Sequence, residues 1–319
     1  HLSTRKTCDT MTQPTVLVTG GAGFIGSHLV EALLADNFLV RVLDNLSTGK
    51  RENLPHHPNV ELIVGDVADP NVVQRATQHC QAVAHLAAVA SVQASVDDPI
   101  GTHQSNLVAT IQLCEAMRAA NVSRIVFASS AAVYGNHGEG QAVDEDTPKA
   151  PLTPYAADKL ASEYYLDFYR RQHGLDPVIF RFFNIYGPRQ DPSSPYSGVI
   201  SIFTERAQKG LPITVFGDGH QTRDFVFVQD LVAVLMQALK APRATHQPMN
   251  VGWNQATSLN QLLQIIQRVL GHLPTVDYTT PRPGDIRHSR ANNERLLTHY
   301  RLPTPATDMH EGLRRLLGK

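Results

Sequence analysis

Residues 19–26 read Thr-Gly-Gly-Ala-Gly-Phe-Ile-Gly, between a β-branched run at 16–19 and a helical pattern at 26–35. The glycines allow a tight turn and let the backbone approach a bound group closely. The N-terminus of the following helix offers free N–H groups and the positive end of its dipole to phosphates. A strand, a glycine-rich turn and a helix in this order predict a dinucleotide site. The alternative is a glycine-rich turn that holds no ligand.

Beyond this turn, short apolar runs continue to alternate with helical patterns. We expect strands at 39–43, 60–64, 82–86, 125–128 and 178–182, and helices at 72–79, 103–119 and 155–172. Apolar strands separated by helices predict a parallel sheet that is covered on both faces. The expected fold class is therefore α/β, with a Rossmann-type doubly wound parallel sheet.

The pattern changes after Asn184. Residues 187–198 are rich in proline, serine and glycine and predict a loop or lid. Strands are then expected at 214–216, 225–228 and 249–251, and helices at 229–240 and 259–270. We interpret residues 11–183 as the dinucleotide-binding domain, to which 225–252 returns. Residues 184–224 and 253–319 would form a smaller C-terminal α/β lobe for the substrate.

Composition excludes several classes of function. Of 319 residues, 42% are hydrophobic and 18% are charged, with a formal net charge of −1, so no overall field attracts nucleic acid or an anionic membrane. No run of eighteen apolar residues predicts a membrane span. The cysteines Cys8, Cys80 and Cys114 are odd in number and show no metal-ligand pattern, which favours a reducing, cytoplasmic compartment. No metal site is expected.

The polar residues 1–10 precede a plausible start at Met11 and lack the apolar core of a signal peptide. We interpret them as a leader or as residues added for expression.

Tyr155 and Lys159 lie four residues apart in a predicted helix, so their side chains share one face. A nearby ammonium is expected to lower the pKa of the tyrosine, which could then take a proton from an alcohol. The spacing alone is common and usually marks a solvated helix face. Because it follows the glycine-rich turn and a serine pair, Ser129 and Ser130, it predicts alcohol–ketone chemistry on a bound nicotinamide.

Asp44 ends the second strand, where a carboxylate can accept both hydroxyls of an adenosine ribose and would repel a 2′-phosphate. NAD is therefore favoured over NADP, although Lys50 and Arg51 follow closely. Asp66, after the third strand, is placed either to reach the adenine or to form an ordinary strand-end turn. His85 is interpreted as a structural histidine.

A set of motifs resembles the extended short-chain dehydrogenase/reductases. The motifs are Gly-Gly-Ala-Gly-Phe-Ile-Gly at 20–26, Asp-Asn-Leu at 44–46, Gly-Asp at 65–66, His-Leu-Ala-Ala at 85–88, Ser-Ser-Ala-Ala-Val-Tyr-Gly at 129–135, Tyr-x-x-x-Lys at 155–159 and Arg-Phe-Phe-Asn at 181–184. Within that family the chain is similar to nucleotide-sugar 4-epimerases, most closely to bacterial UDP-N-acetylglucosamine 4-epimerases. That likeness is carried by Gly-Pro-Arg-Gln-Asp-Pro at 187–192, Ser-Gly-Val-Ile at 197–200, Gly-Asp-Gly at 217–219, Thr-Arg-Asp-Phe at 222–225 and Arg-Pro-Gly-Asp-Ile-Arg-His-Ser at 282–289.

The resemblance implies three groups of site residues. The catalytic group is Ser130, Tyr155 and Lys159. The NAD group is Gly20, Gly23, Phe24, Ile25, Gly26, Asp44, Asn45, Ser47, Gly49, Asp66, Val67, Leu86, Ala87, Ala88, Asn106, Ser129, Tyr155, Lys159 and Phe183. The nucleotide-sugar group is Ser130, Asn184, Val199, Phe216, Arg223, Arg282, Asp285 and Ser289. Arginines at 223 and 282 suit the two phosphates of a UDP-sugar, although a single arginine is by default a surface residue.

The residues after Ser130 discriminate among the chemistries of this family. Sugar 4,6-dehydratases place an Asp-Glu pair there, and UDP-glucuronate decarboxylases usually keep an acidic residue, whereas this chain has Ala131 and Ala132. The expected reaction is therefore reversible C4 epimerisation through a 4-keto sugar with tightly bound NAD.

In the 4-epimerases that this chain resembles, the residue at the position of Ser289 limits the room beside the sugar C2 substituent, and a tyrosine there is typical of enzymes confined to UDP-glucose and UDP-galactose. The small Ser289 resembles those that also accept N-acetylated sugars, so the resemblance favours UDP-N-acetylglucosamine and UDP-N-acetylgalactosamine. The alternative is that Ser289 faces solvent.

Alternatives are the UDP-glucose/UDP-galactose pair, another NAD-dependent nucleotide-sugar enzyme, and a non-catalytic NAD-binding regulatory protein. Intact Ser130, Tyr155 and Lys159 count against the last of these. The resemblance also implies a homodimer in which helices 103–119 and 155–172 form a four-helix bundle. The expected helical stripes are Leu107, Ile111 and Cys114 on one helix, and Leu160, Tyr164 and Phe168 on the other.

Overall fold

The structure is a computed structural model that describes residues 13–136, 140–192, 198–302 and 306–319. The predicted leader and residues 193–197 of the proline-rich segment lie outside the described residues.

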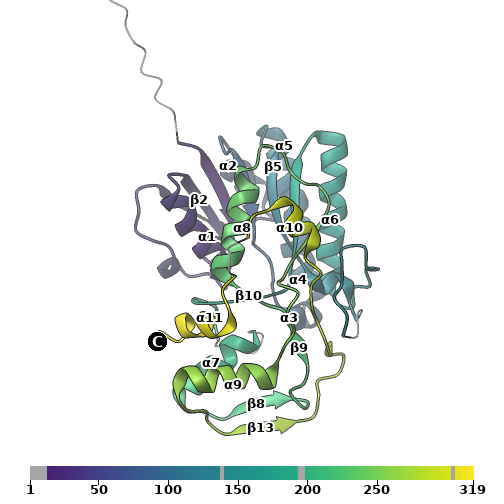
Figure 1. Ribbon diagram of the computed structural model, residues 1–319. Coiled ribbons are helices and arrows are strands. Elements are labelled where there is room, and N and C mark those ends of the chain that lie inside the picture. Colours follow the sequence, from purple (N-terminus) through teal and green to yellow (C-terminus); the bar gives the residue numbers. More distant parts are fainter. Residues whose placement is uncertain (1–12, 137–139, 193–197, 303–305) are drawn as a thin grey trace, which may run out of the picture.

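A seven-stranded parallel sheet forms the larger part of the molecule (Figure 1). Its strands, in spatial order, are β11 (Met249–Val251), β6 (Asp176–Phe182), β5 (Arg124–Ser130), β4 (Ala82–His85), β1 (Thr15–Thr19), β2 (Leu39–Asp44) and β3 (Val60–Val64). The chain runs outward from β1 through β2 to β3, then returns to β4 on the other side of β1. This reversal is the doubly wound Rossmann pattern, and the predicted fold class is confirmed.

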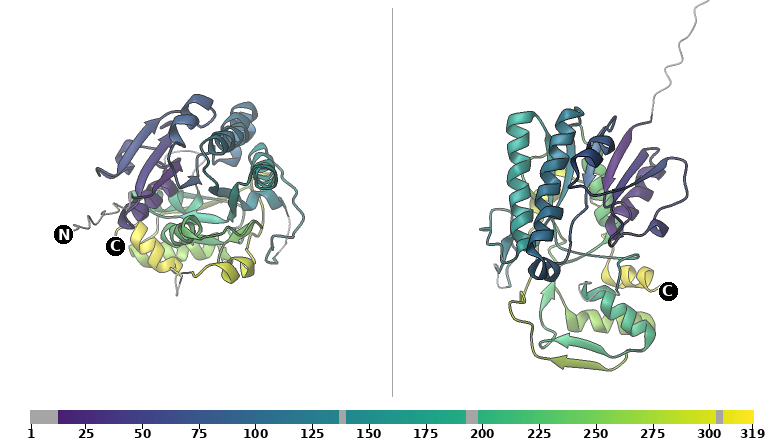
Figure 2. Two further views of the ribbon diagram at one scale, coloured as in Figure 1. Left: turned by 90° about the horizontal axis from the view of Figure 1, so that it is seen from above. Right: turned by 180° about the vertical axis from the view of Figure 1, so that it is seen from behind.

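Both faces of the sheet are covered because its strands alternate apolar side chains between two layers. On one face, Val16 and Val18 pack in a core with helices α1 (Phe24–Ala35) and α8 (Val228–Lys240). Leu17 points to the other face and packs in a core with the further helices. Those helices are α2 (Pro70–Ala76), α5 (Ala109–Ala119) and α6 (Pro154–His173), of which α5 and α6 stand side by side on the outside of the molecule (Figure 2).

Two predicted helices differ from their observed bounds by three residues or more at one end. Helix α2 begins at Pro70, before the expected start at 72, because the Asp69 side chain accepts the Asn71 N–H and proline suits the first helical turn. It ends at Ala76, and His79 has a positive φ of 61°. The helix expected at 103–119 begins earlier, as α4 (Pro99–His103), and continues through a π-helical segment, η2 (Gln104–Val108), into α5.

Several shorter elements connect the longer ones. They are η1 (Arg51–Asn53), α3 (Val92–Asp97), η3 (Ala131–Tyr134), β7 (Asn184–Tyr186), β9 (Thr222–Arg223), β10 (Phe225–Phe227) and β12 (Thr257–Ser258). Strand β7 pairs with β10, and β9 pairs with β12.

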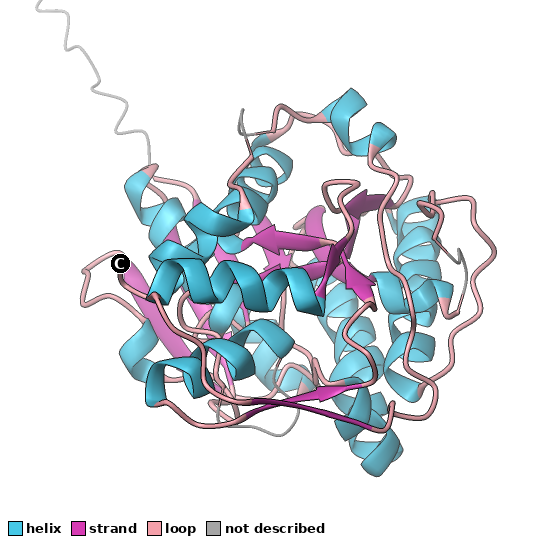
Figure 3. Ribbon diagram, turned by 60° about the horizontal axis from the view of Figure 1, so that its bottom comes forward, coloured by secondary structure: helices cyan, strands magenta, loops and turns pink. Residues whose placement is uncertain are grey.

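A smaller lobe lies below the sheet and faces the viewer in Figure 3. It contains α7 (Val199–Lys209), β8 (Ile213–Phe216), α9 (Leu259–Leu270), β13 (Val276–Thr279) and α11 (Met309–Leu316). The sequence analysis did not predict α7. Its pattern is nevertheless present, since the buried residues Ile200, Phe203 and Ala207 have helical spacing between Gly198 and Gly210. These residues share one core with α9 and β8.

The chain crosses between the two parts several times. Strand β11 joins the edge of the seven-stranded sheet, and α8 packs on its face. Helix α10 (Glu294–His299) also packs there, since Leu296 and Tyr300 belong to the same core as Val16.

Within 225–252, α8 and β11 pack with the sheet, whereas Phe225 and Phe227 belong to the core of the smaller lobe. Helix α10, within the segment 253–319 assigned to the lobe, also contacts the sheet. The division into two domains stays a prediction.

Candidate active site

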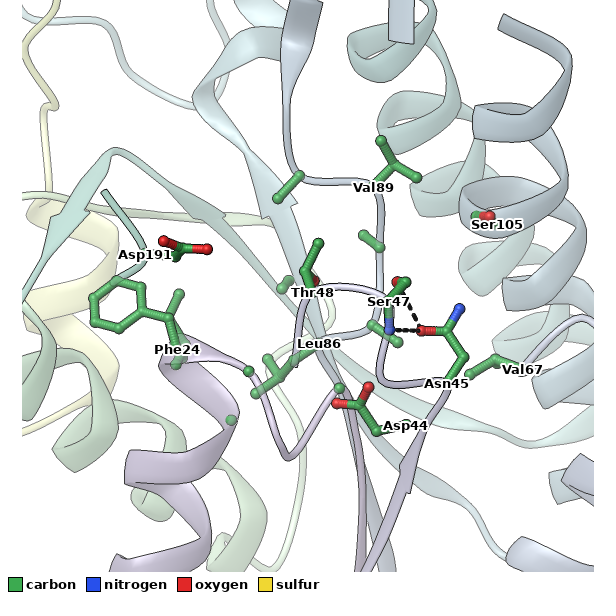
Figure 4. A pocket seen from close by; sticks show the side chains of 18 of the residues that line it. Phe24, Asp44, Asn45, Ser47, Thr48, Val67, Leu86, Val89, Ser105 and Asp191 are labelled. Carbon is green, nitrogen blue, oxygen red and sulfur yellow. Dashed lines mark hydrogen bonds between the residues drawn. The ribbon is translucent and has the colours of Figure 1, made fainter. Parts of the chain in front are cut away.

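A cavity of about 590 Å³ opens at the carboxyl ends of the parallel strands (Figure 4). It extends past the reversal point between β1 and β4, where ligands bind in open α/β sheets. Its volume lies within the range of small-molecule and cofactor sites. The residues that line it come from the ends of six strands, from the first turns of α1 and α6, from η1, η2 and β7, and from loops that include 189–192.

The glycine-rich turn brings backbone close to backbone at one wall of the cavity. Gly20 has a φ of +70°, and a Cβ there would lie 2.9 Å from the Ala87 backbone N. A Cβ on Gly26 would collide with the carbonyl oxygen of Gly20. The glycines therefore hold the N-terminus of α1 against the strand ends at the wall of the cavity, a position that suits a pyrophosphate group.

Asp44 presents a carboxylate to the same cavity from the end of β2. Its Oδ2 accepts the Ala22 N–H at 3.0 Å, and its Oδ1 accepts the Leu46 N–H at 2.8 Å. A carboxylate has about four acceptor positions, so two remain for hydroxyl groups. Asn45 Oδ1 accepts both the N–H and the hydroxyl of Ser47 and so orders the adjoining loop (Figure 4). This donor and acceptor set fits an adenosine ribose.

Most residues of the predicted NAD group line this one cavity. They are Gly20, Gly23, Phe24, Ile25, Gly26, Asp44, Asn45, Ser47, Asp66, Val67, Leu86, Ala87, Ala88, Ser129, Tyr155, Lys159 and Phe183. The other two lie behind the wall. Gly49 leaves room for the Asp44 carboxylate, since a Cβ at 49 would lie 2.7 Å from Asp44 Oδ2. Asn106 accepts the Val89 N–H at 2.8 Å and so holds the loop after β4.

The three predicted catalytic residues also meet at this cavity. Ser130 ends β5, and Tyr155 and Lys159 lie in the first turns of α6. The helix starts where it does because Thr153 Oγ1 accepts the Ala156 N–H at 3.2 Å and Pro154 occupies the first turn. The Ser130 side chain is placed to hydrogen-bond with the Tyr155 hydroxyl, an interaction that favours the phenolate.

One electrostatic expectation from the sequence is wrong in this structure. The pKa of Tyr155 is raised, because burial disfavours the phenolate more than the Ser130 hydrogen bond favours it. Lys159 does not lower it as predicted, since its Nζ donates to the Ala128 carbonyl at 2.7 Å and lies 5.8 Å from the centre of the Tyr155 ring. Burial lowers the pKa of Lys159 itself to about 8, opposed by the charges of Glu163 and Asp158.

His85 has the structural role that the sequence indicated. Its Nδ1 lies 2.6 Å from Thr19 Oγ1 and its Nε2 lies 3.0 Å from Thr110 Oγ1. Burial lowers its pKa to about 3, with a further contribution from the Lys159 charge. The imidazole is therefore neutral and holds β4 between β1 and the helix layer.

The predicted nucleotide-sugar residues are divided between several places. Ser130 lines the main cavity, Asn184 begins β7 just beyond β6, and Val199 begins α7. In the smaller lobe, Arg223 forms an ion pair with Asp285 at 3.1 Å.

Arg282 completes this set, because its guanidinium stacks over the Phe216 ring at 4.0 Å from the centre. None of Arg223, Phe216, Arg282 and Asp285 lines the main cavity. The structure therefore gathers these four residues in the smaller lobe, apart from the NAD group.

Ser289 borders a second, small cavity of about 20 Å³. Ala131, Tyr134 and Phe183 also line it, and Phe183 lines the main cavity as well. The Ser289 N–H donates to the Thr222 carbonyl at 3.2 Å, which fixes the segment that carries the serine. Phe183 is therefore shared by the cavity beside Ser289 and the main cavity.

The loop at 189–192 supplies cavity residues that the sequence reading did not assign. Arg189 anchors it to α1, through an ion pair with Glu31 and a hydrogen bond of 2.9 Å to His28 Nδ1. The Nε2 of His28 lies 2.7 Å from the Pro188 carbonyl oxygen. The sequence identified Gly-Pro-Arg-Gln-Asp-Pro at 187–192 as a motif. The sequence pattern did not indicate that this segment would fold back onto α1.

Among the described residues, no three His, Cys, Asp or Glu side chains gather into a set that could hold a metal ion. In the same part of the chain, no helix has the length and apolar character needed to cross a membrane.

Comparison with known proteins places the chain in a family. Residues 16–252 match the model of the NAD dependent epimerase/dehydratase family. A protein of Methanocaldococcus jannaschii named putative UDP-glucose 4-epimerase is 40% identical over 85% of this chain and 87% of its own.

Two solved structures are similar along almost their whole length. UDP-N-acetylglucosamine 4-epimerase from Methanobrevibacter ruminantium, in complex with UDP-N-acetylmuramic acid, is 37% identical with a TM-score of 0.90 and covers 97% of this chain and 98% of its own. UDP-glucose 4-epimerase from Thermus thermophilus, in complex with NAD, is 41% identical with a TM-score of 0.87 and covers 95% and 98%.

The chain belongs to the NAD dependent epimerase/dehydratase family. The predicted family and the predicted cofactor, NAD, are confirmed. The residues present fit that cofactor, since the glycine turn lines the cavity at the N-terminus of α1 and the Asp44 carboxylate keeps acceptor positions for a ribose.

Gly26→Ala is predicted to destabilise the fold and abolish NAD binding, because the new methyl group would overlap the Gly20 carbonyl oxygen. Gly23→Ala is the matched control, since its Cβ would lie 3.2 Å from the same oxygen. We expect Gly23→Ala to lower NAD affinity with a melting temperature near that of the wild type. Thermal unfolding and NAD titration measure both effects, and equal melting temperatures for Gly26→Ala and wild type would contradict the steric account.

Proposed function

We propose that the chain catalyses reversible C4 epimerisation of UDP-N-acetylglucosamine and UDP-N-acetylgalactosamine through a 4-keto sugar. The observation that carries the proposal is the meeting of Ser130, Tyr155 and Lys159 at one cavity with the glycine turn and Asp44. This arrangement joins an acid–base group to a dinucleotide site, which is what reversible oxidation of an alcohol requires.

In the proposed mechanism Tyr155 takes the proton of the sugar C4 hydroxyl and later returns it. Ser130, placed to hydrogen-bond with Tyr155, donates a hydrogen bond to the same sugar oxygen. Bound NAD would supply the hydride acceptor and donor for C4, and its oxidised nicotinamide would add a positive charge to the cavity that Tyr155 lines. Lys159 is held by the Ala128 carbonyl and, in the proposal, its ammonium contacts the nicotinamide ribose rather than the phenol. The nicotinamide charge favours the phenolate and offsets the effect of burial on the Tyr155 pKa.

The residues beyond Ser130 support epimerisation over elimination or decarboxylation. Ala131 and Ala132 follow the catalytic serine in η3 and offer no second acid or base. A dehydratase needs a group that removes a second proton from the sugar ring, and none stands at these positions. Oxidation and reduction at one carbon are the steps that the side chains can support.

The lobe residues support a UDP-sugar as the substrate class. Arg223 and Arg282 have planar guanidinium groups suited to bind two phosphates, and Asp285 and Phe216 hold them in place before any phosphate arrives. In the proposal the phosphates compete with Asp285 for Arg223, and the nucleotide lies between the lobe and the main cavity.

The preference for acetylated sugars rests on the size of Ser289. The second cavity beside Ser289 and Ala131 shows that small side chains leave free volume there. The Ser289 hydroxyl could also hydrogen-bond to an acetamido group. UDP-glucose/UDP-galactose epimerisation is the second candidate, favoured by the names of the Methanocaldococcus and Thermus relatives.

The assay that tests this proposal compares kcat/KM on the acetylated and non-acetylated pairs in one preparation, without added NAD. We expect turnover of both C4 epimers of the acetylated pair and a lower kcat/KM on the other pair. A clear preference for UDP-galactose would contradict the substrate assignment, and no turnover of any UDP-sugar would contradict the reaction.

We also propose a homodimer formed by the helix layer of α5 and α6. Of the six residues expected on the stripes, Cys114 is buried in the sheet core, Leu107 is also buried and Leu160 packs beside η3, so these three are not free for the seam. Ile111 is half-buried. Tyr164 and Phe168 remain exposed on α6.

Tyr165 on α6 and Ile100 on α4 are exposed beside them, which leaves an apolar helix surface for a second copy. We further propose a cytoplasmic location, which the free, buried thiols of Cys80 and Cys114 support.

Tyr155→Phe is predicted to lower kcat by about 10²–10⁴-fold, because it removes the proton acceptor and keeps the ring. Tyr165→Phe, the same change on an exposed tyrosine of α6, is the control and should leave kcat unchanged. Steady-state kinetics with intact NAD binding measures the effect. Near wild-type turnover in Tyr155→Phe would remove this residue from the mechanism.

Ser289→Tyr is predicted to lower kcat/KM selectively for the acetylated sugars, because the phenol ring fills the space beside the second cavity. Ser289→Ala keeps that space and should preserve the ratio between the two substrate pairs. An unchanged ratio in Ser289→Tyr would show that residue 289 does not contact the sugar substituent.

Light scattering at micromolar protein is predicted to give the mass of two chains. Replacing both Tyr164 and Phe168 by Asp should give monomers, because charges would be buried in the proposed seam. Tyr278→Asp, at an exposed position on β13, is the control and should remain dimeric. A monomeric wild type would refute the proposed interface.

A further inference from the structure

Glu163 lies one helical turn after Lys159 on α6 and is 4% exposed, yet the proposed mechanism gives it no role. Its Oε2 accepts the Ser129 hydroxyl at 2.6 Å. Arg181 on β6 donates to both of its oxygens, from Nη2 to Oε1 at 2.7 Å and from Nε to Oε2 at 3.1 Å. One carboxylate therefore joins α6 to the ends of two neighbouring strands.

Stability alone does not account for this buried ion pair. Desolvation of two charges offsets much of their attraction, and apolar residues of similar volume often serve as well. The pair is nevertheless fully bonded, since Arg181 also donates to the Tyr134 hydroxyl at 3.0 Å and to the Glu145 carbonyl at 3.2 Å. Such a network specifies one arrangement of the groups it joins.

Those groups are the carriers of the catalytic residues. Ser129, which is 2% exposed, directly precedes Ser130 at the end of β5. Tyr155 and Lys159 lie on α6, the element that carries Glu163. The Glu163–Ser129 bond therefore fixes the distance between the two elements whose side chains must share one sugar oxygen. A displacement of about 1 Å in such a site can cost about 10²-fold in rate.

Glu163 also sets the charges around Lys159. Lys159 faces Tyr155, Asp158 and Glu163 on its own helix. From the strands packed against the helix it meets the neutral His85 on β4 and the Phe127 ring on β5, with the Lys159 Nζ 5.0 Å from the ring centre.

Arg181, on β6, lies behind the Glu163 carboxylate, and Tyr134 on η3 is bonded to Arg181. The Asp158 carboxylate is bonded to His103 at 2.9 Å. Burial favours a neutral amine on Lys159, and Glu163 is the largest influence in favour of the ammonium.

We propose that Glu163 is a positioning residue of the epimerase site, which sets the Ser130–Tyr155 geometry through Ser129 and keeps Lys159 charged. The inference rests on the proposed roles of Ser130, Tyr155 and Lys159. Glu163 does not line the main cavity. In the proposal it acts on Ser130 through β5 and on Tyr155 and Lys159 through α6.

Three variants separate the two effects in the pH dependence of kcat. Glu163→Gln removes the charge and weakens both bonds, so kcat should fall by up to about 10²-fold at every pH. The Lys159 pKa, lowered by burial to about 8 in the wild type, should fall further, by about one pH unit. Because the ammonium is the active form, activity is lost as pH rises through this pKa, and the alkaline limb should move to lower pH.

Glu163→Asp keeps the charge but is one methylene shorter, so it should lower kcat and leave the alkaline limb in place. Asp158→Asn removes a charge near Lys159 without touching Ser129, so it should move the alkaline limb and leave the kcat plateau near wild type. Glu61→Gln, on the exposed ion pair with Arg41 at β3, is the matched control and should change neither.

A direct readout needs no substrate. NMR titration of isotopically labelled lysine gives the Lys159 pKa in each variant, and thermal unfolding gives its stability. If Glu163→Gln does not fold, the double replacement of Glu163 and Arg181 by Met removes both charges and should fold with the same two effects.

An unchanged Lys159 pKa together with an unchanged kcat in Glu163→Gln would overturn the proposal. Lower stability with both catalytic readouts unchanged would reduce Glu163 to a structural residue and would also overturn it. Absence of UDP-sugar turnover in the wild type would instead contradict the proposed function, while the Lys159 titration would still decide whether Glu163 controls its charge.

Discussion

The carboxyl ends of parallel strands must lie at one edge of their sheet, and the whole candidate site depends on this constraint. Gly20 follows β1, Asp44 ends β2, Leu86 follows β4 and Ser130 ends β5, and all four line one cavity. Residues more than a hundred positions apart are gathered by strand order alone. The reversal of the chain at β1 then opens the space in which a dinucleotide fits.

A buried carboxylate attaches the smaller lobe to this edge. Asp224, fully buried between β9 and β10, accepts the backbone N–H groups of Trp253, Asn254 and Ala291 at 2.9–3.0 Å. Burial raises its pKa to about 6, against the effect of these hydrogen bonds. Its own carbonyl accepts the Asn184 N–H at 3.0 Å. One residue thus ties the end of β6, the exit of β11 and the segment after Ser289 together, and so places the lobe over the sheet edge.

Much of this arrangement could be predicted from the sequence because it depends on residues that are close together in the chain. The glycine turn, the strand-ending Asp44 and the pair Tyr155 and Lys159 each follow a spacing with one physical meaning. Where the prediction was wrong, the cause was tertiary. The direction of the Lys159 side chain, toward Ala128 and not toward the phenol, depends on packing that no spacing encodes.

Other features escaped because they join distant segments. Glu163 meets Arg181 and Ser129 only after α6 has docked on β5 and β6, although the recurrence of a charged residue four positions after Lys159 was visible. Helix α7 was not predicted, because its apolar residues directly follow the proline-rich stretch 187–198, which was interpreted as a loop. The lobe residues Arg223 and Arg282 were named by resemblance, and their bonds to Asp285 and Phe216 could be seen only in three dimensions.

The central claim is that one carbon of the sugar is oxidised and reduced within a closed site. Substrate labelled with deuterium at C4, followed by NMR through epimerisation in ordinary water, tests it most directly. The account predicts that the C4 epimer keeps its deuterium at C4, since the hydrogen never leaves the site. Loss of the label to solvent would contradict it, because that result requires a different bond to be broken and a different set of acid–base groups.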